Sequence, residues 1–218
     1  MSETPAAPAA ADSASTSNSA FEILEQKVSY GIGRNIGADL TRNLGDDTDA
    51  EALVAGHLDS LSGAAPQVPQ AELSAAFHTF QAKTQAAAES AVAKKAGTEF
   101  LTANGARPEV TTTESGLLYE ILTPGTGPKP ASNNTVKVHY HGTLIDGTVF
   151  DSSVERGEPV EFPVTGVMPG WIEALQLMPT GSKWKLFIPS NLAYGDRATG
   201  KIPAGSTLVF EVELLEVK

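Results

Sequence analysis

Cysteine is absent from this 218-residue sequence, so no disulfide can form within the chain. The fold must therefore be stabilised by its core and by oligomerisation, and zero cysteine fits either a reducing or an oxidising compartment. Long hydrophobic runs are also absent, because no segment approaches the roughly 18 apolar residues of a membrane span. The sequence thus predicts a protein with no transmembrane helix and no membrane partner.

Positive charge is scarce. The chain has 15 Lys and Arg against 26 Asp and Glu, a formal net charge of −11, which argues against nucleic acid as a main partner. Residues 1–20 are rich in Ala, Ser, Pro and Thr and have neither the basic nor the apolar region of a secretory signal. We expect a disordered tail over residues 1–19 and a cytoplasmic protein, or a periplasmic one if a signal was removed.

The first ordered segment, residues 20–68, is predicted to be helical. An apolar stripe recurs at three- and four-residue steps, Ser19 can cap its start, and Gly45 suits its end. The stripe is formed by Phe21, Leu24, Val28, Ile32, Ile36, Leu40 and Leu44. Gly31, Gly33 and Gly37 lie inside this helix. They indicate either close approach of another helix or a locally weak helix with incidental glycines.

A second, shorter helix is expected from Asp49 to Leu61, with Leu53, Val54 and Leu58 on one side. Two helices of this length cannot bury a large core as a monomer. We therefore expect residues 20–68 to be a dimerisation domain in which two chains intertwine as a twofold-symmetric homodimer.

Residues 69–114 are predicted to form a long helix and a linker. Pro69 suits a helix start, and no proline follows before Pro108. The apolar stripe of Leu73, Phe77 and Phe80 fades into Ala, Gln, Glu, Ser and Lys between residues 83 and 95. This pattern favours a solvated spacer about 50 Å long, and the alternative is a helix that lies on the C-terminal domain.

Residues 115–218 are rich in strands. Strands are expected over residues 117–122, 135–144, 149–151, 160–164, 182–188 and 207–217, and one helical run over 171–177. Asp146-Gly147 is a hairpin-type turn, and Pro163 indicates an edge strand or a strand end. The predicted fold class is α+β: a helical arm, a long spacer helix, and a twisted antiparallel sheet with one short helix packed across it.

The aromatic residues of this segment lie among β-type residues, with no nucleophile and base beside them. Such a site binds an apolar group and strains it, without breaking bonds. Proline isomerisation is a reaction of this kind, because turning an X-Pro amide crosses a barrier of about 18–20 kcal/mol without covalent change.

Sequence blocks in this segment resemble the FK506-binding (FKBP) peptidyl-prolyl cis-trans isomerases in order and spacing. They are Val138-His139-Tyr140, Gly142-Thr143-Leu144, Asp146-Gly147, Val149-Phe150-Asp151-Ser152-Ser153, Pro169-Gly170-Trp171, Ala193-Tyr194-Gly195 and Thr207-Leu208-Val209-Phe210. The N-terminal half, with runs such as Ser29-Tyr30-Gly31-Ile32-Gly33, resembles the dimerising arm of the bacterial Mip/FkpA/FklB branch, and the missing signal peptide points to its FklB-like members.

The resemblance implies an isomerase domain over residues 115–218, with a pocket between the helix and the sheet. The catalytic residues that it implies are Tyr140, Asp151, Trp171, Tyr194 and Phe210. The substrate-binding residues that it implies are Phe150, Arg156, Phe162, Val167, Met168 and Ile202. Trp171 would be the floor, and Arg156 would hold Asp151 at the rim. Two departures are Val160, where many members have an aromatic residue, and a shorter loop over residues 195–205.

Other chemistry has weaker support. His139 and His141 share one face of a strand, but no third metal ligand is evident, and we expect neither a metal nor a cofactor. Gly125-Thr126-Gly127-Pro128 lacks the lysine and the helix of a phosphate loop. Asp46, Asp47 and Asp49 resemble the start of a calcium loop, but an acidic helix cap is the better interpretation.

Two functions follow from the resemblance. The first is an isomerase that turns X-Pro bonds in unfolded or partly folded polypeptides, with FK506-like macrolides as further ligands. The second is a dimeric chaperone or peptide-binding module in which isomerase activity is secondary.

Overall fold

The computed structural model describes residues 21–44 and 49–218. The expected tail over residues 1–19, the Ser19 cap, the Gly45 helix end, and Asp46 and Asp47 lie outside the described residues. The chain divides into two compact units, residues 1–70 and 71–218. None of the described helices is long and apolar enough to cross a membrane.

The first unit has two helices, α1 (Leu24–Leu44) and α2 (Ala50–Ser62), as the apolar periodicity predicts. Asp49 caps α2, because its carboxylate accepts hydrogen bonds from the backbone N–H groups of Glu51 and Ala52. Gly63 ends this helix in the left-handed conformation, with φ of 68°. The acidic residue before α2 is therefore a helix cap.

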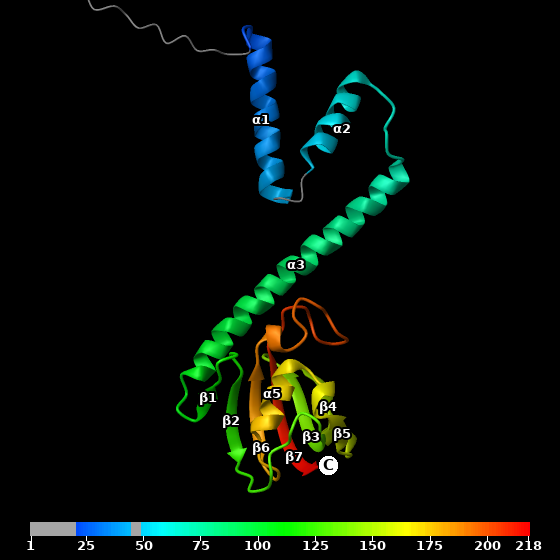
Figure 1. The fold of residues 1–218 in the computed structure, drawn as a ribbon. Coiled ribbons are helices and arrows are strands. Elements are labelled where there is room, and N and C mark those ends of the chain that lie inside the picture. Colours follow the sequence, from blue (N-terminus) through cyan, green and yellow to red (C-terminus); the bar gives the residue numbers. More distant parts are fainter. Residues whose placement is uncertain (1–20, 45–48) are drawn as a thin grey trace, which may run out of the picture. The chain divides into compact units, whose positions relative to one another are not determined.

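The second unit begins with α3 (Gln70–Gly105), which continues for 36 residues or about 54 Å. An antiparallel sheet follows, in the order β1-β2-β6-β7-β3-β4, with β5 paired to β3 (Figure 1). The strands are β1 (Val110–Thr112), β2 (Leu118–Thr123), β3 (Thr135–Leu144), β4 (Val149–Ser152), β5 (Val160–Pro163), β6 (Lys183–Ile188) and β7 (Leu208–Val217). Two helices, α4 (Ser153–Arg156) and α5 (Pro169–Leu177), and two short 3₁₀ turns, η2 (Val164–Gly166) and η3 (Ser190–Leu192), connect them.

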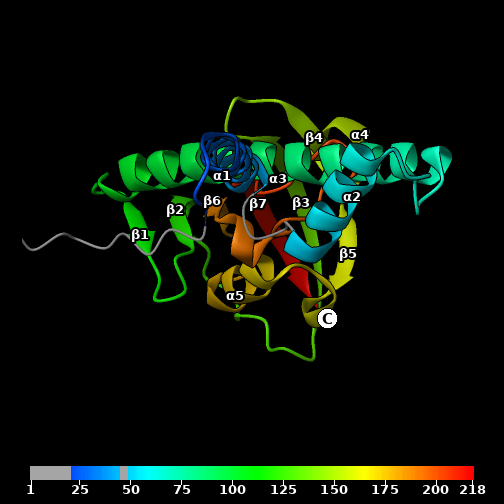
Figure 2. The ribbon, with the colours of Figure 1, turned by 90° about the horizontal axis from the view of Figure 1, so that it is seen from above.

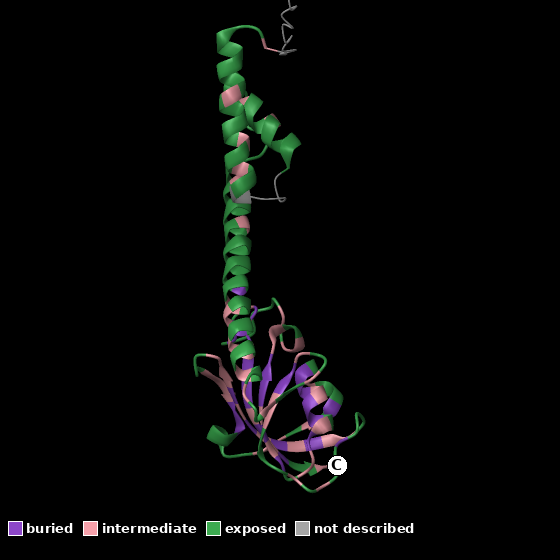
Figure 3. Ribbon diagram, turned by 90° about the vertical axis from the view of Figure 1, so that its left-hand side faces the viewer, coloured by how far each residue is buried: buried purple, intermediate pink, exposed green. Residues whose placement is uncertain are grey.

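Residue alternation along the central strands decides which side chains enter the core. On β3, Val136, Val138 and Tyr140 are buried, while Lys137 and His139 face the other side of the sheet. The inner residues of β6 and β7 join them under α5 in one cluster. Figure 3 shows the buried positions concentrated in these strands and in α5.

The outer face of the sheet is covered in part by α3. Phe100 and Leu101 of this helix pack against a second cluster of Leu118, Phe187 and Val209. The rings of Phe100 and Phe187 are 5.9 Å apart. Figure 2 shows α3 and α5 on opposite sides of the sheet. This packing explains why Phe187 and Val209 are buried although their strand neighbours point inward.

The expected solvated spacer is therefore correct for only part of α3. Two small residues of this helix are buried: Ser90, within the polar segment, and Gly97, just beyond it. Their small size lets the helix approach the sheet domain closely. A Cβ atom on Gly97 would lie 2.2 Å from Oγ1 of Thr207. Sequence periodicity did not reveal this contact, since a stripe of small residues carries almost no hydrophobic signal.

Substituting Gly97 by alanine should lower the free energy of unfolding of the sheet domain by about 1–3 kcal/mol. Alanine favours a helix by about 1 kcal/mol, but the close contact with Thr207 outweighs that gain. Both tryptophans, Trp171 and Trp184, lie in the second unit, so urea unfolding followed by tryptophan fluorescence reports on this domain.

The matched control is the double variant Gly97→Ala with Thr207→Ala, which removes Oγ1 and should regain part of the loss. Stabilisation by Gly97→Ala alone would contradict close packing at this position.

Candidate functional site

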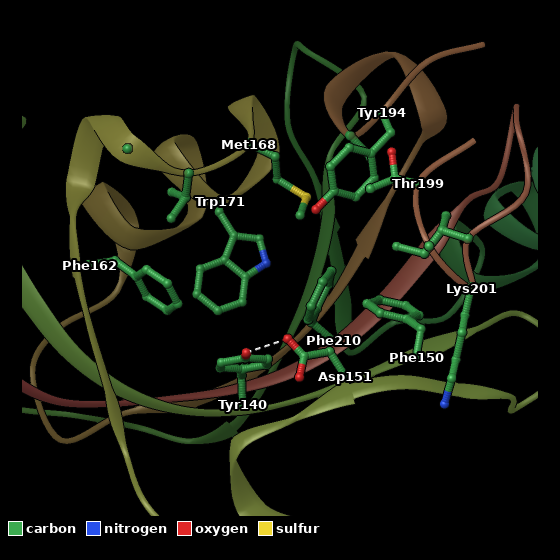
Figure 4. A pocket seen from close by; sticks show the side chains of 15 residues that line it. Tyr140, Phe150, Asp151, Phe162, Met168, Trp171, Tyr194, Thr199, Lys201 and Phe210 are labelled. Carbon is green, nitrogen blue, oxygen red and sulfur yellow. Dashed lines mark hydrogen bonds between the residues drawn. The ribbon is translucent and has the colours of Figure 1, made fainter. Parts of the chain in front are cut away.

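A cavity of about 590 Å³ opens between α5, the inner face of the sheet and the chain before β7. It is lined by Tyr140, Phe150, Asp151, Phe162, Gly166, Val167, Met168, Trp171, Ala193, Tyr194, Thr199, Gly200, Lys201, Ile202 and Phe210. Figure 4 shows aromatic rings on most sides of it. The volume suits a small apolar group or a short stretch of peptide.

Trp171 forms the floor of the cavity and is 3% exposed. Its helix begins with Pro169, whose fixed φ favours a first helical turn, and Gly170 follows because a Cβ there would lie 2.6 Å from Cγ2 of Ile188. The indole Nε1 has no hydrogen-bond partner among the described residues. In Figure 4 this nitrogen faces the side of the cavity on which Tyr194 lies.

Three aromatic rings pack edge to face against Trp171. The ring centroids of Tyr140, Phe162 and Phe210 lie 5.5, 6.0 and 5.2 Å from that of Trp171, with interplanar angles between 82° and 85°. Tyr140 and Phe210 come from the neighbouring strands β3 and β7. Edge-to-face geometry is the favoured arrangement of aromatic pairs, so the floor and walls hold one another in place.

Gly142 makes room for one more wall. A Cβ atom at this position would lie 2.7 Å from the Phe210 ring and 2.8 Å from the Phe150 ring. Its absence lets Phe150 stand edge-on against Phe210, with centroids 5.4 Å apart. Gly142 is thus a structural requirement of the cavity that we recognised in the sequence only as part of a motif.

A polar corner lies at one side of the cavity. The Tyr140 hydroxyl donates to Oδ2 of Asp151 at 2.5 Å, drawn as a dashed line in Figure 4. Arg156 forms an ion pair with the other oxygen of Asp151 and donates to the Tyr140 hydroxyl at 2.9 Å. Its guanidinium carbon also lies 5.6 Å from the centroid of the Tyr140 ring, within cation–π range.

This corner fixes the ionisation of its members. Burial opposes charge on Asp151, but the hydrogen bonds from Tyr140 and Arg156 outweigh burial and lower the pKa of the carboxyl. Burial and the neighbouring Asp151 raise the pKa of the Tyr140 hydroxyl. Asp151 is therefore a carboxylate and Tyr140 a neutral phenol near neutral pH.

Local structure places Arg156 at this corner. The Ser152 side chain caps α4 by accepting from the N–H of Glu155, and Gly157 ends the helix with φ of 76°. One helical turn then brings Arg156 back over Asp151. We did not expect this helix, because a four-residue turn is too short to give an apolar period.

The facing wall is the loop over residues 193–205. It contributes Tyr194, which is 39% exposed, and Ile202, which is buried. A small antiparallel bridge pairs Thr199 with Ile202 and shapes the loop. The Tyr194 hydroxyl makes no hydrogen bond within the described residues and is free to donate to a bound group.

Ten of the eleven site residues expected from the sequence lie in the cavity wall. Arg156 is the eleventh and lies behind Asp151. Sequence reasoning missed Gly166, Ala193, Thr199, Gly200 and Lys201 as wall residues. Their proximity to Val167, Tyr194 and Ile202 in the chain was the available signal.

The two histidines of β3 have structural partners. His139 Nδ1 lies 3.1 Å from the Ser153 hydroxyl, and His141 Nδ1 lies 3.0 Å from the Ser152 hydroxyl. Within residues 21–44 and 49–218, no group of three or more His, Asp or Glu side chains could hold a metal ion. The site chemistry that these residues offer is apolar contact, hydrogen bonding and one ion-paired carboxylate.

Comparison with known proteins identifies relatives of both halves of the chain. Residues 127–215 match the family model "FKBP-type peptidyl-prolyl cis-trans isomerase", and residues 25–121 match "Domain amino terminal to FKBP-type peptidyl-prolyl isomerase". The chain is 50% identical over 200 residues to the FKBP-type 22 kDa peptidyl-prolyl cis-trans isomerase of Escherichia coli, covering 90% of this chain and 97% of that protein.

Two further relatives extend the comparison. The outer membrane protein MIP of Legionella longbeachae is 41% identical over 212 residues, covering 94% of this chain and 91% of that protein. The crystal structure of FkpA from Escherichia coli matches with a TM-score of 0.62 at 36% identity, covering 91% of this chain and 99% of that one.

An identity of 50% over nearly the full length, together with an aromatic cavity where the family's sequence blocks meet, shows that the chain belongs to the FKBP-type peptidyl-prolyl cis-trans isomerases.

Proposed function

We propose that the aromatic cavity is the place where this isomerase turns X-Pro bonds, and that Trp171 receives the proline ring. The observation that supports this best is the cavity's chemistry: aromatic walls surround one carboxylate whose charge is already paired. A proline ring fits such a surface without loss of polar contacts.

The reaction then depends on polarity. A planar amide is stabilised by resonance, which polarises its carbonyl group. Resonance is lost in the twisted transition state, so the carbonyl becomes less polar and an apolar cavity favours it over the planar ground state. This is differential binding of the transition state, and it requires no covalent intermediate.

Polar groups at the edge of the cavity would orient the peptide. The Tyr194 hydroxyl would donate to one substrate carbonyl, and backbone donors near Met168, just before α5, would anchor another. Asp151 would polarise the site or contact the amide. It is a poor general base, because its two partners lower the pKa of its carboxyl and so weaken its affinity for a proton. Phe150, Phe162, Val167, Ile202 and Phe210 would enclose the ring. An FK506-like macrolide would occupy the same cavity and compete with peptide.

A second part of the proposal concerns residues 20–68, which we infer to be a dimerisation arm. Large apolar side chains stay exposed on α1, including Val28, Ile32 and Ile36, and Leu58 and Leu61 on α2. Within the described residues, a Cβ atom on Gly31, Gly33 or Gly37 would meet nothing within 4 Å. An apolar stripe with accessible glycines is suited to close packing by a helix of a second copy.

A dimer would carry two cavities and could hold one unfolded client at both, which raises the effective concentration of its prolines. This is the basis for a chaperone role beside catalysis. The cytoplasmic location stays a prediction from the composition of residues 1–20, and one relative is named as an outer membrane protein.

Trp171→Ala and Asp151→Asn should each lower kcat/KM for an X-Leu-Pro-Phe peptide by about tenfold or more. The first removes the floor and the second removes the charge while keeping the shape. Matched controls are Trp184→Phe, a buried ring stacked on Tyr119 outside the cavity, and the surface variant Glu158→Gln. A protease-free NMR exchange assay measures the rate, and circular dichroism verifies folding. Full activity in a folded Trp171→Ala variant would show that the cavity is not the site of isomerisation.

The pH dependence should be flat. The pKa of Asp151 lies below its ordinary value of 3.8, so its carboxylate and its contribution to stability are present above that value and are lost only as the pH falls through the lowered one. The raised pKa of Tyr140 keeps the phenol neutral in mild base. We expect kcat/KM to stay constant from about pH 5 to about pH 9. A bell-shaped profile centred near neutrality would instead indicate acid–base catalysis.

If residues 20–68 are a dimerisation arm, light scattering at micromolar concentration should give twice the chain mass of 22.7 kDa. Ile32→Asp should shift the mass toward that of one chain, because a charge on the stripe is costly to bury. The exposed substitution Arg34→Gln is the control. The Ile32→Asp variant should keep its rate on short peptides and lose rate on a folding protein substrate. If the unmodified protein has the mass of a single chain, residues 20–68 are not a dimerisation arm.

A further inference from the structure

The loop over residues 193–205 is closed on itself at its base. The N–H of Gly205 donates to the carbonyl of Gly195 at 2.8 Å, and the N–H of Gly195 donates to the carbonyl of Ser190 at the same distance. The loop between these ends supplies Thr199, Gly200, Lys201 and Ile202 to the cavity, and Tyr194 stands beside its base. The position of the base therefore decides where this whole wall lies.

Helix α3 contacts that base through two side chains on one of its faces. The Ser90 hydroxyl donates to Oδ1 of Asp196 at 2.6 Å, and Nζ of Lys94 lies 2.5 Å from the same oxygen. Ser90 and Lys94 are four residues apart, so they lie one turn from each other on the helix. Both contacts lower the pKa of the Asp196 carboxyl, and the contact with Lys94 has the larger effect.

The other end of the base contacts the same turn of α3 through its backbone. Gly205 has φ of 75°, and a Cβ atom on it would lie 2.5 Å from the carbonyl oxygen of Ser90 and 2.6 Å from its hydroxyl. A glycine is thus required by both conformation and space. The helix is held against both ends of the loop at one point, the side chain and backbone of Ser90.

The ion pair between Lys94 and Asp196 contributes little to overall stability. The Asp196 side chain is 68% exposed and that of Lys94 45%, and ion pairs so exposed typically contribute about 1 kcal/mol or less. Ser90, by contrast, is 4% exposed, and its hydrogen bond to a carboxylate has a fixed direction. Such a contact gives the loop a defined orientation relative to the helix.

We propose that Ser90, Lys94 and Asp196 are positioning residues for the isomerase reaction, acting through the loop on Tyr194 and Ile202. These three residues are called the α3–loop junction below. On this view α3 is part of the working isomerase unit, although it precedes the sheet by sequence. The proposal rests on the cavity being the site of isomerisation.

The test uses the full chain with Asp196→Ala, which removes both contacts of the junction at once, the hydrogen bond from Ser90 and the ion pair with Lys94. Because the loop forms a wall that holds substrate, KM should rise about tenfold while kcat changes less than about twofold. Ser90→Ala and Lys94→Met should give smaller increases. Matched controls on exposed positions of the same helix are Lys95→Met and Glu99→Gln, which should leave both constants unchanged.

A charge exchange separates positioning from a simple loss of folding. The double variant Lys94→Asp with Asp196→Lys restores the ion pair and should recover most of the lost affinity. In a ¹⁵N NMR spectrum, Asp196→Ala should shift the amide signals of residues 199–202 and leave those of Phe162 and Trp171 in place.

Two results would overturn the proposal. One is an unchanged KM in Asp196→Ala. The other is a rise in KM that comes with a lower melting temperature and is not reversed by the charge exchange, since this would make the junction a stabilising contact only. If instead Trp171→Ala is fully active, the cavity itself is misassigned, and that failure is distinguishable from failure of the junction.

Discussion

The edge-to-face packing around Trp171 is the interaction on which the site depends. The indole is enclosed by rings from β3, β5 and β7, each packed edge to face against it. Gly142 is the space that this packing needs, because a side chain there would meet two of the rings. The cavity is therefore a preformed shape, and its shape is set by core packing of the same kind that stabilises the sheet.

The polar corner is compatible with such an apolar site because the charge of Asp151 is paired with Arg156, which lies behind the cavity wall. Asp151 has one oxygen on Tyr140 and the other on Arg156, so a peptide bound as we propose would meet a carboxylate whose field is already partly neutralised. An unpaired carboxylate there would attract water and raise the polarity that the twisted amide disfavours. The electrostatics and the apolar walls thus serve one requirement.

Much of this arrangement could be predicted from the sequence. Alternation along residues 135–144 and 208–217 placed Tyr140 and Phe210 on the inner face, and the family's sequence blocks indicated the cavity wall. The α3–loop junction could not be predicted, because its contacts join residues that lie far apart in the sequence. The glycines that allow α3 to approach closely, Gly97 and Gly205, leave no periodic signal. Helix α4 was missed for a related reason: its formation depends on a single serine cap and one glycine.

The attachment of α3 at Ser90 and Gly97 also fixes the helical phase of the part of α3 that precedes Ser90. Each residue added or removed between positions 71 and 89 would turn the part of α3 before the change by about 100° and move it by about 1.5 Å along the helix axis. Changes of about seven or eleven residues nearly preserve the phase, whereas changes of two or five do not. A protein fused to the start of α3 would therefore keep its orientation to the sheet domain only when the helix length changes by a near-whole number of turns.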